Sequence, residues 1–312
     1  MRDRAPGFSE GVDTILVTGA RGQVGLELCR SLSLLGRVVA VARDTCDLAS
    51  ADQIVATMRS ARPRVVINAG GYTAVDTAET EADVAHAINA VAPGLLAAEA
   101  KALGSLMVHY STDYVFDGAS EAPYTEADVT APLSIYGRSK LDGELAIRDT
   151  GADNWVFRTS WVFGLQGANF LKSIARAALT RTSLSVVADQ IGAPTPAALL
   201  ADVTALAVRG YLSGLPMPYG VYHVAATGET SWYQYACRIV ETLARSGVPV
   251  AVTPDRIVPI AAADYGSRAA RPANSRLDTS CLRAALGVDL PDWSDGVDRV
   301  LAQLIEGRRL FG

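Results

Sequence analysis

The chain has 312 residues, of which 49% are hydrophobic and 20% are charged, and its formal net charge at pH 7 is −5. This length can bury a large core in one α/β domain or in two domains, and the composition is that of a globular enzyme. The acidic balance without a basic block argues against a nucleic-acid partner, and no apolar run reaches the ~20 residues that cross a membrane. Segment 1–13 is polar, without the apolar stretch of a signal peptide, and is expected to be an N-terminal extension of a cytoplasmic protein.

The first half of the chain alternates short apolar segments with segments of helical periodicity. The apolar segments predict strands at residues 14–18, 37–41, 65–67, 106–110 and 155–157. Strands that are almost continuously apolar and alternate with helices form a parallel sheet covered on both faces. The sequence therefore predicts an α/β fold with a doubly wound, Rossmann-type parallel sheet.

After residue 163 this alternation becomes irregular. Helices are expected at 171–179 and 232–245, with strands at 184–187 and 220–224. We therefore expect a larger Rossmann-type domain and a smaller C-terminal α/β domain. The expected boundaries are 14–163 with about 197–225 for the first domain, and 164–196 with 226–312 for the second.

A glycine-rich loop follows the first predicted strand and opens the first predicted helix. It contains Gly19, Gly22 and Gly25, with Gln23 and Val24 between the last two. The first glycine permits a tight turn, the second lets the backbone approach a pyrophosphate, and the third lets helix and strand pack closely. The N–H groups at the start of the helix then face the phosphates. This spacing, G-x-x-G-x-x-G, is that of extended short-chain dehydrogenases/reductases.

The end of the second predicted strand indicates which nicotinamide cofactor is preferred. An acid at this place binds the ribose of NAD, whereas this chain has Ala42 and Arg43. A guanidinium can bind the 2′-phosphate of NADP, so we expect NADPH, with NADH as the alternative. Asp47 and Leu48 are expected at the adenine, as in related enzymes. Gly70, Gly71 and Tyr72 follow the third strand and are expected at the cofactor. The small residues here let the backbone pass close to the ribose and phosphates.

The catalytic candidates are Tyr136 and Lys140, which form a Tyr-x-x-x-Lys pattern. Residues four apart share one face of a helix. We expect the Lys140 ammonium to lower the pKa of the Tyr136 phenol, which can then give a proton to a substrate carbonyl. Thr112, at the end of the fourth strand, can hydrogen-bond the same carbonyl oxygen. The alternative interpretation is a solvated tyrosine and lysine and a threonine that only fills the strand.

Several motifs in order resemble the dTDP-4-dehydrorhamnose reductase family, an extended short-chain dehydrogenase/reductase family, over about residues 15–293. The most specific is His-Tyr-Ser-Thr-Asp-Tyr-Val-Phe at 109–116, and others are Gly-Gln-Val-Gly at 22–25, Thr-Ala-Val-Asp at 73–76, Asp-Gln-x-Gly-Ala-Pro-Thr at 189–195 and Arg-Pro-x-Asn-Ser at 271–275. The resemblance implies NADPH-dependent reduction of the C4 ketone of a dTDP-4-keto-6-deoxy sugar, dTDP-4-dehydro-L-rhamnose first of all.

The resemblance also implies further site residues. Tyr110 would contact the cofactor, Thr112 and Asp113 the sugar, Trp161 would form a flat wall beside the sugar, and Arg271 would bind the substrate pyrophosphate. Some family members hold Mg²⁺ through a glutamate where this chain has Ala198, so we expect no metal. A monomer and a homodimer both remain open.

Three other functions remain as alternatives at this point. The first is a reductase for another nucleotide 4-ketodeoxysugar of an antibiotic pathway, of the dihydrostreptose type. The second is a sugar 4,6-dehydratase, which is disfavoured because Asp113 is followed by Tyr114 rather than by a glutamate. The third is a non-catalytic, NADP-binding regulatory subunit, against which the complete set of Thr112, Tyr136 and Lys140 argues.

Overall fold

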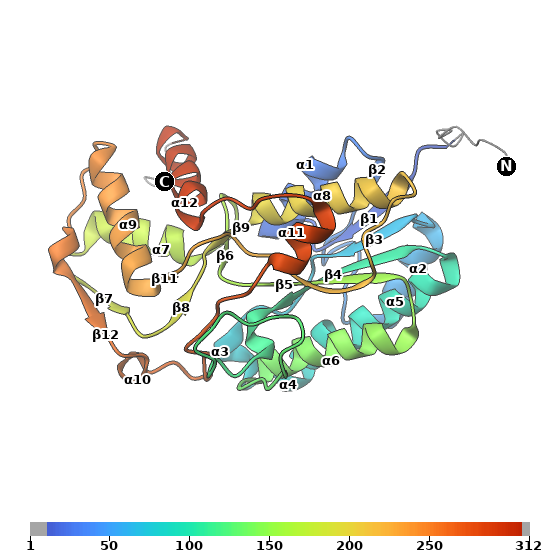
Figure 1. The fold of residues 1–312 in the computed structure, drawn as a ribbon, viewed down its shortest axis with the longest axis horizontal. Coiled ribbons are helices and arrows are strands. Elements are labelled where there is room, and N and C mark those ends of the chain that lie inside the picture. Colours follow the sequence, from blue (N-terminus) through green and yellow to red (C-terminus); the bar gives the residue numbers. More distant parts are fainter. Residues whose placement is uncertain (1–10, 308–312) are drawn as a thin grey trace.

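The computed structural model describes residues 11–307, so residues 1–10 of the expected N-terminal extension lie outside the described part. A six-stranded sheet with the order β10-β5-β4-β3-β1-β2 forms the larger lobe, and all neighbouring strands are parallel. Figure 1 shows this sheet between two layers of helices. Its strands are β1 (Thr14–Thr18), β2 (Arg37–Ala40), β3 (Val65–Asn68), β4 (Leu106–Thr112), β5 (Asn154–Thr159) and β10 (Gly220–His223). The predicted Rossmann-type α/β class is confirmed.

The pleat of the central strands explains why helices cover both faces. In β1, Ile15 and Val17 pack in one apolar cluster, whereas Leu16 packs in another on the opposite face. The first cluster is closed by α1 (Gln23–Leu32) and α8 (Ala197–Leu212), and the second by α2 (Ala51–Ala61), α5 (Ala92–Leu103) and α6 (Ile135–Thr150). Both faces of the strand are therefore buried, as the nearly continuous apolar sequence indicates.

Short elements connect β3 with α5 and β4 with α6. They are α3 (Val75–Ala78), α4 (Ala82–His86), a π-helix η1 (Ala87–Val91) and a 3₁₀ turn η2 (Asp113–Val115). The π-helix joins α4 to α5 without a break in the helical run.

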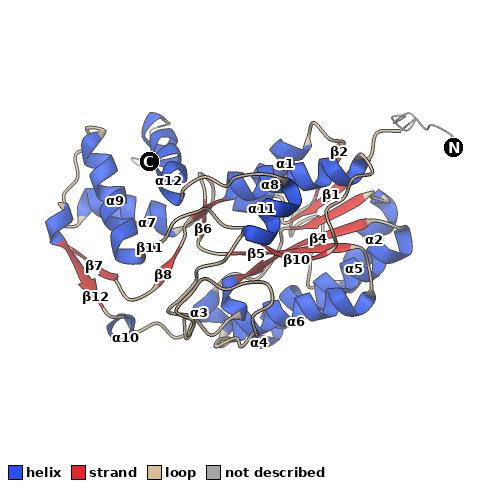
Figure 2. Ribbon diagram, in the orientation of Figure 1, coloured by secondary structure: helices blue, strands red, loops and turns tan. Residues whose placement is uncertain are grey.

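A smaller lobe with its own apolar core lies at the left in Figures 1 and 2. Its helices are α7 (Phe170–Thr180), α9 (Trp232–Arg245), α10 (Ala262–Tyr265) and α12 (Trp293–Glu306). Its short strands are β7 (Leu184–Val187), β8 (Ile191–Gly192), β11 (Thr230–Ser231) and β12 (Ile257–Ile260), with a 3₁₀ turn η3 (Pro254–Arg256). The pair β6 (Val162–Phe163) and β9 (Thr195–Pro196) lies where the chain leaves and re-enters the larger lobe.

The C-terminal segment returns once more to the larger lobe. Helix α11 (Ser280–Leu286) places Leu282 in the cluster that covers the sheet, and Leu290 joins it there. A domain division drawn along these clusters therefore differs from the sequence-based division, which gives 226–312 to the smaller domain. Within residues 11–307, no helix is long and apolar enough to cross a membrane.

Candidate active site

A cleft of about 880 Å³ opens at the carboxyl ends of the parallel strands, toward the smaller lobe. Its walls include the loops after β1, β2 and β3, the end of β4, the start of α6, and Asn169 and Trp232 of the smaller lobe. Open α/β sheets bind their ligands at this edge. The volume is near the upper end of the roughly 300–1,000 Å³ of small-molecule sites.

The glycine loop forms one end of the cleft and fits a dinucleotide pyrophosphate. Gly19 has φ +65°, and a Cβ at this position would lie 2.5 Å from the backbone nitrogen of Gly70. Gly22 caps α1 without a side chain, so the first N–H groups of the helix stay free for an anion. A Cβ at Gly25 would clash with the carbonyl oxygen of Gly19. Gly25 does not line the cleft, so we assign it the packing of helix against loop rather than ligand contact.

The predicted adenine and ribose residues lie together next to this loop. Arg43, Asp47 and Leu48 line the cleft, and Asp47 accepts a hydrogen bond from the backbone of Ala49. Arg21, which the sequence analysis did not select, also lines the cleft and pairs with Asp44 at 2.8 Å. Two guanidinium groups, of Arg21 and Arg43, therefore come from the two loops that meet at this end.

The segment after β3 is fixed by a side chain from the π-helix. Asn89 Oδ1 accepts a hydrogen bond from the backbone N–H of Tyr72, and its Nδ2 donates to the carbonyl of Tyr72 and to Ser139. This buried amide holds Gly70, Gly71 and Tyr72 against the helix that carries the catalytic candidates. π-Helical turns occur often at functional sites. The sequence analysis missed Asn89 because a π-turn has no pattern of its own in the sequence.

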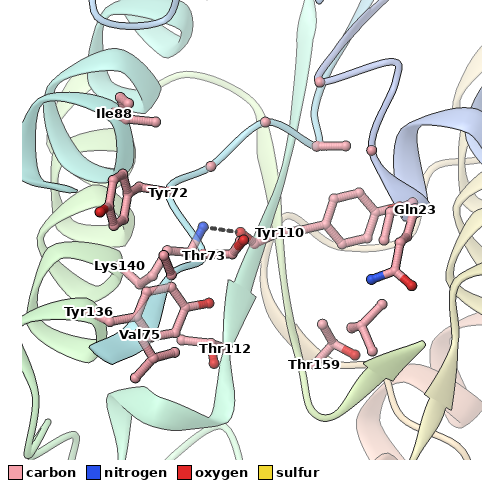
Figure 3. Close-up of a pocket in the computed structure, with 18 of the residues that line it drawn as sticks. Gln23, Tyr72, Thr73, Val75, Ile88, Tyr110, Thr112, Tyr136, Lys140 and Thr159 are labelled. Carbon is pink, nitrogen blue, oxygen red and sulfur yellow. Dashed lines mark hydrogen bonds between the residues drawn. The ribbon is translucent and has the colours of Figure 1, made fainter. Parts of the chain in front are cut away.

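The three catalytic candidates meet in the middle of the cleft, as Figure 3 shows. Thr112 is the last residue of β4, and α6, which begins after the N-cap Ser134, carries Tyr136 and Lys140 on one face. The Thr112 hydroxyl and the Tyr136 phenol both face the cleft, and in the free protein the hydroxyl donates to Asp113 Oδ1. The Tyr136 ring also packs edge-on against Tyr114, with ring centroids 5.5 Å apart. The phenol and the threonine hydroxyl can thus bind one oxygen atom together.

The protonation of Tyr136 differs from the expectation. Burial raises the pKa of Tyr136 to about 12, although the nearby Thr112 hydroxyl opposes this shift. Lys140 does not lower it, because its ammonium is directed to the carbonyl of Tyr110 at 2.5 Å and lies 3.2 Å from His109 Nε2. The expected lowering by Lys140 is therefore wrong for the free protein. A phenol that keeps its proton at neutral pH is suited to give that proton to a nascent alkoxide.

Lys140 and Tyr110 are linked through the backbone rather than through the tyrosine ring. Lys140 Nζ donates to the Tyr110 carbonyl, the contact drawn as a dashed line in Figure 3. The hydroxyl of Tyr110 lies 2.5 Å from Thr204 Oγ1 of α8, and its ring reaches the cleft wall. Burial lowers the pKa of Lys140 to about 8, against the opposing effect of Glu144.

Asp113 follows Thr112 and is almost fully buried at the floor of the cleft. Its Oδ1 accepts a hydrogen bond from Thr112 Oγ1 at 3.1 Å, whereas its Oδ2 has no hydrogen-bond partner among the described residues. Burial raises the pKa of this carboxyl to about 7. An unpartnered buried oxygen in a ligand cleft is suited to bind a substrate hydroxyl.

Trp161 stands where the two lobes meet and has an unusual backbone. Its φ of +48° lies in the left-handed region that non-glycine residues rarely adopt. Its ring stacks on Trp232 with centroids 3.6 Å apart, and a Cβ at Gly192 would lie 2.7 Å from this ring. Both tryptophans line the cleft. The predicted flat wall is thus two rings deep, and the sequence analysis missed Trp232 because the stacking partners are distant in the chain.

Arg271 lines the cleft but is not a free cation. Its Nη2 donates to Asp76 Oδ2 at 2.8 Å, and Asp76 also accepts a hydrogen bond from the backbone of Ala269. Its Nε is buried and has no hydrogen-bond partner within the described residues. The guanidinium is therefore held in place by Asp76 with donor capacity left for a ligand.

Comparison with known proteins places the chain in a family. The family model described as "RmlD substrate binding domain" matches residues 13–306. A dTDP-4-dehydrorhamnose reductase of Burkholderia thailandensis is 47% identical over 297 residues, which are 93% of this chain and 99% of that protein. The enzyme of the same name from Escherichia coli K12 is 44% identical over 93% of this chain and 97% of its own. The chain belongs to the dTDP-4-dehydrorhamnose reductase family.

Solved structures agree with this assignment. A dTDP-4-dehydrorhamnose reductase of Bacillus anthracis in complex with NADP superimposes with a TM-score of 0.83 at 32% identity, over 94% of this chain and 99% of that one. A dTDP-glucose 4,6-dehydratase of Streptomyces venezuelae, at 18% identity and a TM-score of 0.76, shares the fold alone. The resemblance seen in the sequence is confirmed.

Proposed function

We propose that this protein reduces the C4 ketone of dTDP-4-dehydro-L-rhamnose with NADPH and yields dTDP-L-rhamnose. Several members of the family with this name are 40–47% identical to the chain over 93% of its length. The observation that carries the proposal is the meeting of Thr112, Tyr136 and Lys140 in one cleft beside a glycine cradle for a dinucleotide. NADPH supplies the hydride when bound.

The side chains act on the carbonyl oxygen of the substrate. Tyr136 is protonated at neutral pH because its pKa is about 12, so it gives its proton to the oxygen as carbon accepts hydride. The Thr112 hydroxyl, which donates to Asp113 Oδ1 in the free protein, would turn its proton to the same oxygen when the substrate is bound. Lys140, held by the Tyr110 carbonyl, stands at the side of the cleft next to Gly71, where a cofactor ribose can bond it.

The remaining walls suit a nucleotide sugar. We propose that the sugar lies against Trp161, that one of its hydroxyls bonds Asp113 Oδ2, and that the pyrophosphate reaches Arg271. Arg43 and Arg21 are proposed to bind the 2′-phosphate of NADPH. Remote contacts of this kind place the ketone between Tyr136 and the hydride donor.

The setting of the enzyme is part of the proposal. All four cysteines are free, in keeping with a reducing compartment such as the cytoplasm. We propose two domains, with the boundary along the two apolar clusters and with α11 assigned to the larger domain. We propose a monomer or a homodimer, which light scattering distinguishes.

The test is a substrate panel with the purified protein. NADPH oxidation is followed with dTDP-4-dehydro-L-rhamnose, with the free keto sugar, and with other nucleotide-bound 4-keto-6-deoxy sugars. We expect the highest kcat/KM for dTDP-4-dehydro-L-rhamnose. Turnover of a different nucleotide sugar alone would reject the rhamnose assignment, and no turnover of any ketone alongside tight NADPH binding would support a non-catalytic subunit.

A further inference from the structure

Three polar side chains stand side by side beneath the catalytic residues. In the register of the sheet, Thr18 of β1 pairs with Asn68 of β3, and Asn68 pairs with His109 of β4. Residues in register on neighbouring strands point to the same face. All three are 1% exposed or less, so their polar atoms must satisfy one another.

The hydrogen bonds of Asn68 fix the direction of its amide. Asn68 Oδ1 accepts from Thr18 Oγ1 at 2.6 Å and from the backbone N–H of Gly70 at 3.2 Å. A backbone N–H can only donate, so the carbonyl end of the amide must face Gly70. The amide nitrogen is then 3.1 Å from His109 Nδ1. Because an amide nitrogen only donates, Nδ1 of His109 is the acceptor and carries no proton.

The tautomer of His109 follows from this contact. Burial and the nearby Lys140 charge hold the pKa of His109 well below its usual range, so the ring is neutral and has one N–H. That N–H is on Nε2, which lies 3.2 Å from Lys140 Nζ. An ammonium has three donors and no acceptor, whereas a neutral amine has a lone pair that can accept from Nε2–H. His109 therefore favours the neutral amine.

We propose that Asn68 and His109 are positioning residues for Lys140: they hold its amine beside the Tyr110 carbonyl and present to it an N–H donor, which favours the neutral amine over the ammonium. This inference rests on the proposed role of Lys140 in the reduction. It gives a function to the histidine of the His-Tyr-Ser-Thr-Asp motif, which the roles of Thr112 and Asp113 leave unexplained.

The other groups around Lys140 do not supply such a donor. Glu144 lies one turn further along α6 and favours the ammonium, but it is bound by Arg158 through hydrogen bonds of 2.6 and 3.0 Å. The π-helix contributes the uncharged Asn89, and α6 itself contributes Tyr136, whose pKa of about 12 keeps it neutral. Burial of Lys140 lowers its pKa to about 8, in the same direction as the effect proposed for His109.

The first test measures the tautomer of His109 in the free protein. The chain has three histidines, so ¹⁵N-labelled histidine gives few signals, and the His109→Gln variant assigns the one of interest. Long-range ¹H–¹⁵N spectra distinguish a protonated from an unprotonated ring nitrogen. We expect a proton on Nε2 and none on Nδ1 of His109 at neutral pH. A proton on Nδ1 would overturn the proposal without the need for any variant.

The second test reverses the donor. In Asn68→Asp, the carboxylate still accepts from Thr18 and Gly70 but now also accepts from His109, so the proton moves to Nδ1 and Nε2 becomes an acceptor for the ammonium. Only Lys101 and Lys172 accompany Lys140 in the sequence, so ¹³C-lysine NMR can follow its titration. We expect the pKa of Lys140 to rise by about one to two units, the size of one hydrogen bond to a charged group.

Thr18→Val is the matched control. It removes a buried hydrogen bond of the same amide, but the N–H of Gly70 still fixes the amide direction, so the tautomer and the Lys140 titration stay as in the wild type. The alkaline limb of kcat/KM is expected to move upward in Asn68→Asp and to stay in place in Thr18→Val. An unchanged Lys140 titration in folded Asn68→Asp refutes the inference. Because both NMR measurements use free protein, they stand apart from any failure of the proposed substrate.

Discussion

The most informative perturbation of the proposed mechanism is Tyr136→Phe. The substitution removes the phenolic proton but keeps the ring at the start of α6, whose centroid lies 5.5 Å from that of the Tyr114 ring. Loss of a positioned acid lowers kcat by ~10²–10⁴. At about 1.4 kcal/mol for each factor of ten, this corresponds to roughly 3–6 kcal/mol of transition-state stabilisation.

The assay is steady-state turnover combined with NADPH binding measured by fluorescence. We expect the dissociation constant for NADPH to stay within about threefold, because Tyr136 acts on the substrate oxygen rather than on the phosphates. Tyr235→Phe is the matched control: its hydroxyl is buried in the smaller lobe and has no hydrogen-bond partner within residues 11–307, so rate and stability should change little. A Tyr136→Phe rate close to that of the wild type would remove Tyr136 from the proton transfer.

Four further predictions concern the cofactor, metal, substrate and pH. The kcat/KM for NADPH should exceed that for NADH, and Arg43→Ala should abolish this preference; an unchanged preference would show that Arg43 does not select the cofactor. A chelator should change neither the activity nor the mass of the protein in solution measured by light scattering. Ala198 stands where some relatives have a metal-binding glutamate, and Thr112 and Tyr136 can polarise the ketone without a metal. Loss of activity in the chelator would contradict this prediction. Arg271→Ala should raise KM for the nucleotide sugar far more than for the free keto sugar. Equal effects on both substrates, or the same effect in Asp76→Asn, would show that the Arg271–Asp76 ion pair has a structural role instead. Burial raises the pKa of the Asp113 carboxyl to about 7, so the folded protein binds this proton more tightly than the unfolded chain and loses stability as pH rises from about 4 to 7. Asp113→Asn, which cannot ionise, should therefore raise Tm more at pH 8 than at pH 5. A larger gain in Tm at pH 5 would contradict the direction of the shift.

The periodic segments of the chain were predicted well, because local burial patterns decide them. Helix α9 spans Trp232–Arg245 and β1 spans Thr14–Thr18, the ranges expected from their apolar periodicity. Ser50 caps α2 by accepting a hydrogen bond from the backbone of Gln53, whereas Gln53 Oε1 accepts from the backbone N–H of Asp47 and so does not complete a capping box. Local signals therefore fix where an element begins more reliably than which partner a side chain takes.

The site was predicted where residues share one element or follow neighbouring strands. Tyr136 and Lys140 come from one helical face, and parallel strands bring their carboxyl ends to one edge, so Thr112 joins them. The site residues that the sequence analysis missed are defined by contacts between segments that are distant in the chain. The stacking of Trp232 on Trp161 joins the two lobes, and the bonds of Asn89 depend on a π-turn.

Electrostatics was the least predictable part. The direction of the Tyr136 shift depends on how deeply the phenol is buried and on where the Lys140 ammonium points. Neither quantity is encoded in the four-residue spacing. The position of α11 was also not predicted: its Leu282 packs on the sheet, although the helices before and after it belong to the smaller lobe.

The central claim, hydride transfer to the C4 carbon of the sugar, is tested most directly with NADPH deuterated at the transferred position of its nicotinamide C4. The protein is incubated with this cofactor and dTDP-4-dehydro-L-rhamnose, and the product is examined by NMR. The account predicts dTDP-L-rhamnose with deuterium at C4 of the sugar and at no other carbon. Deuterium retained in the cofactor, or product sugar without deuterium at C4, would contradict it.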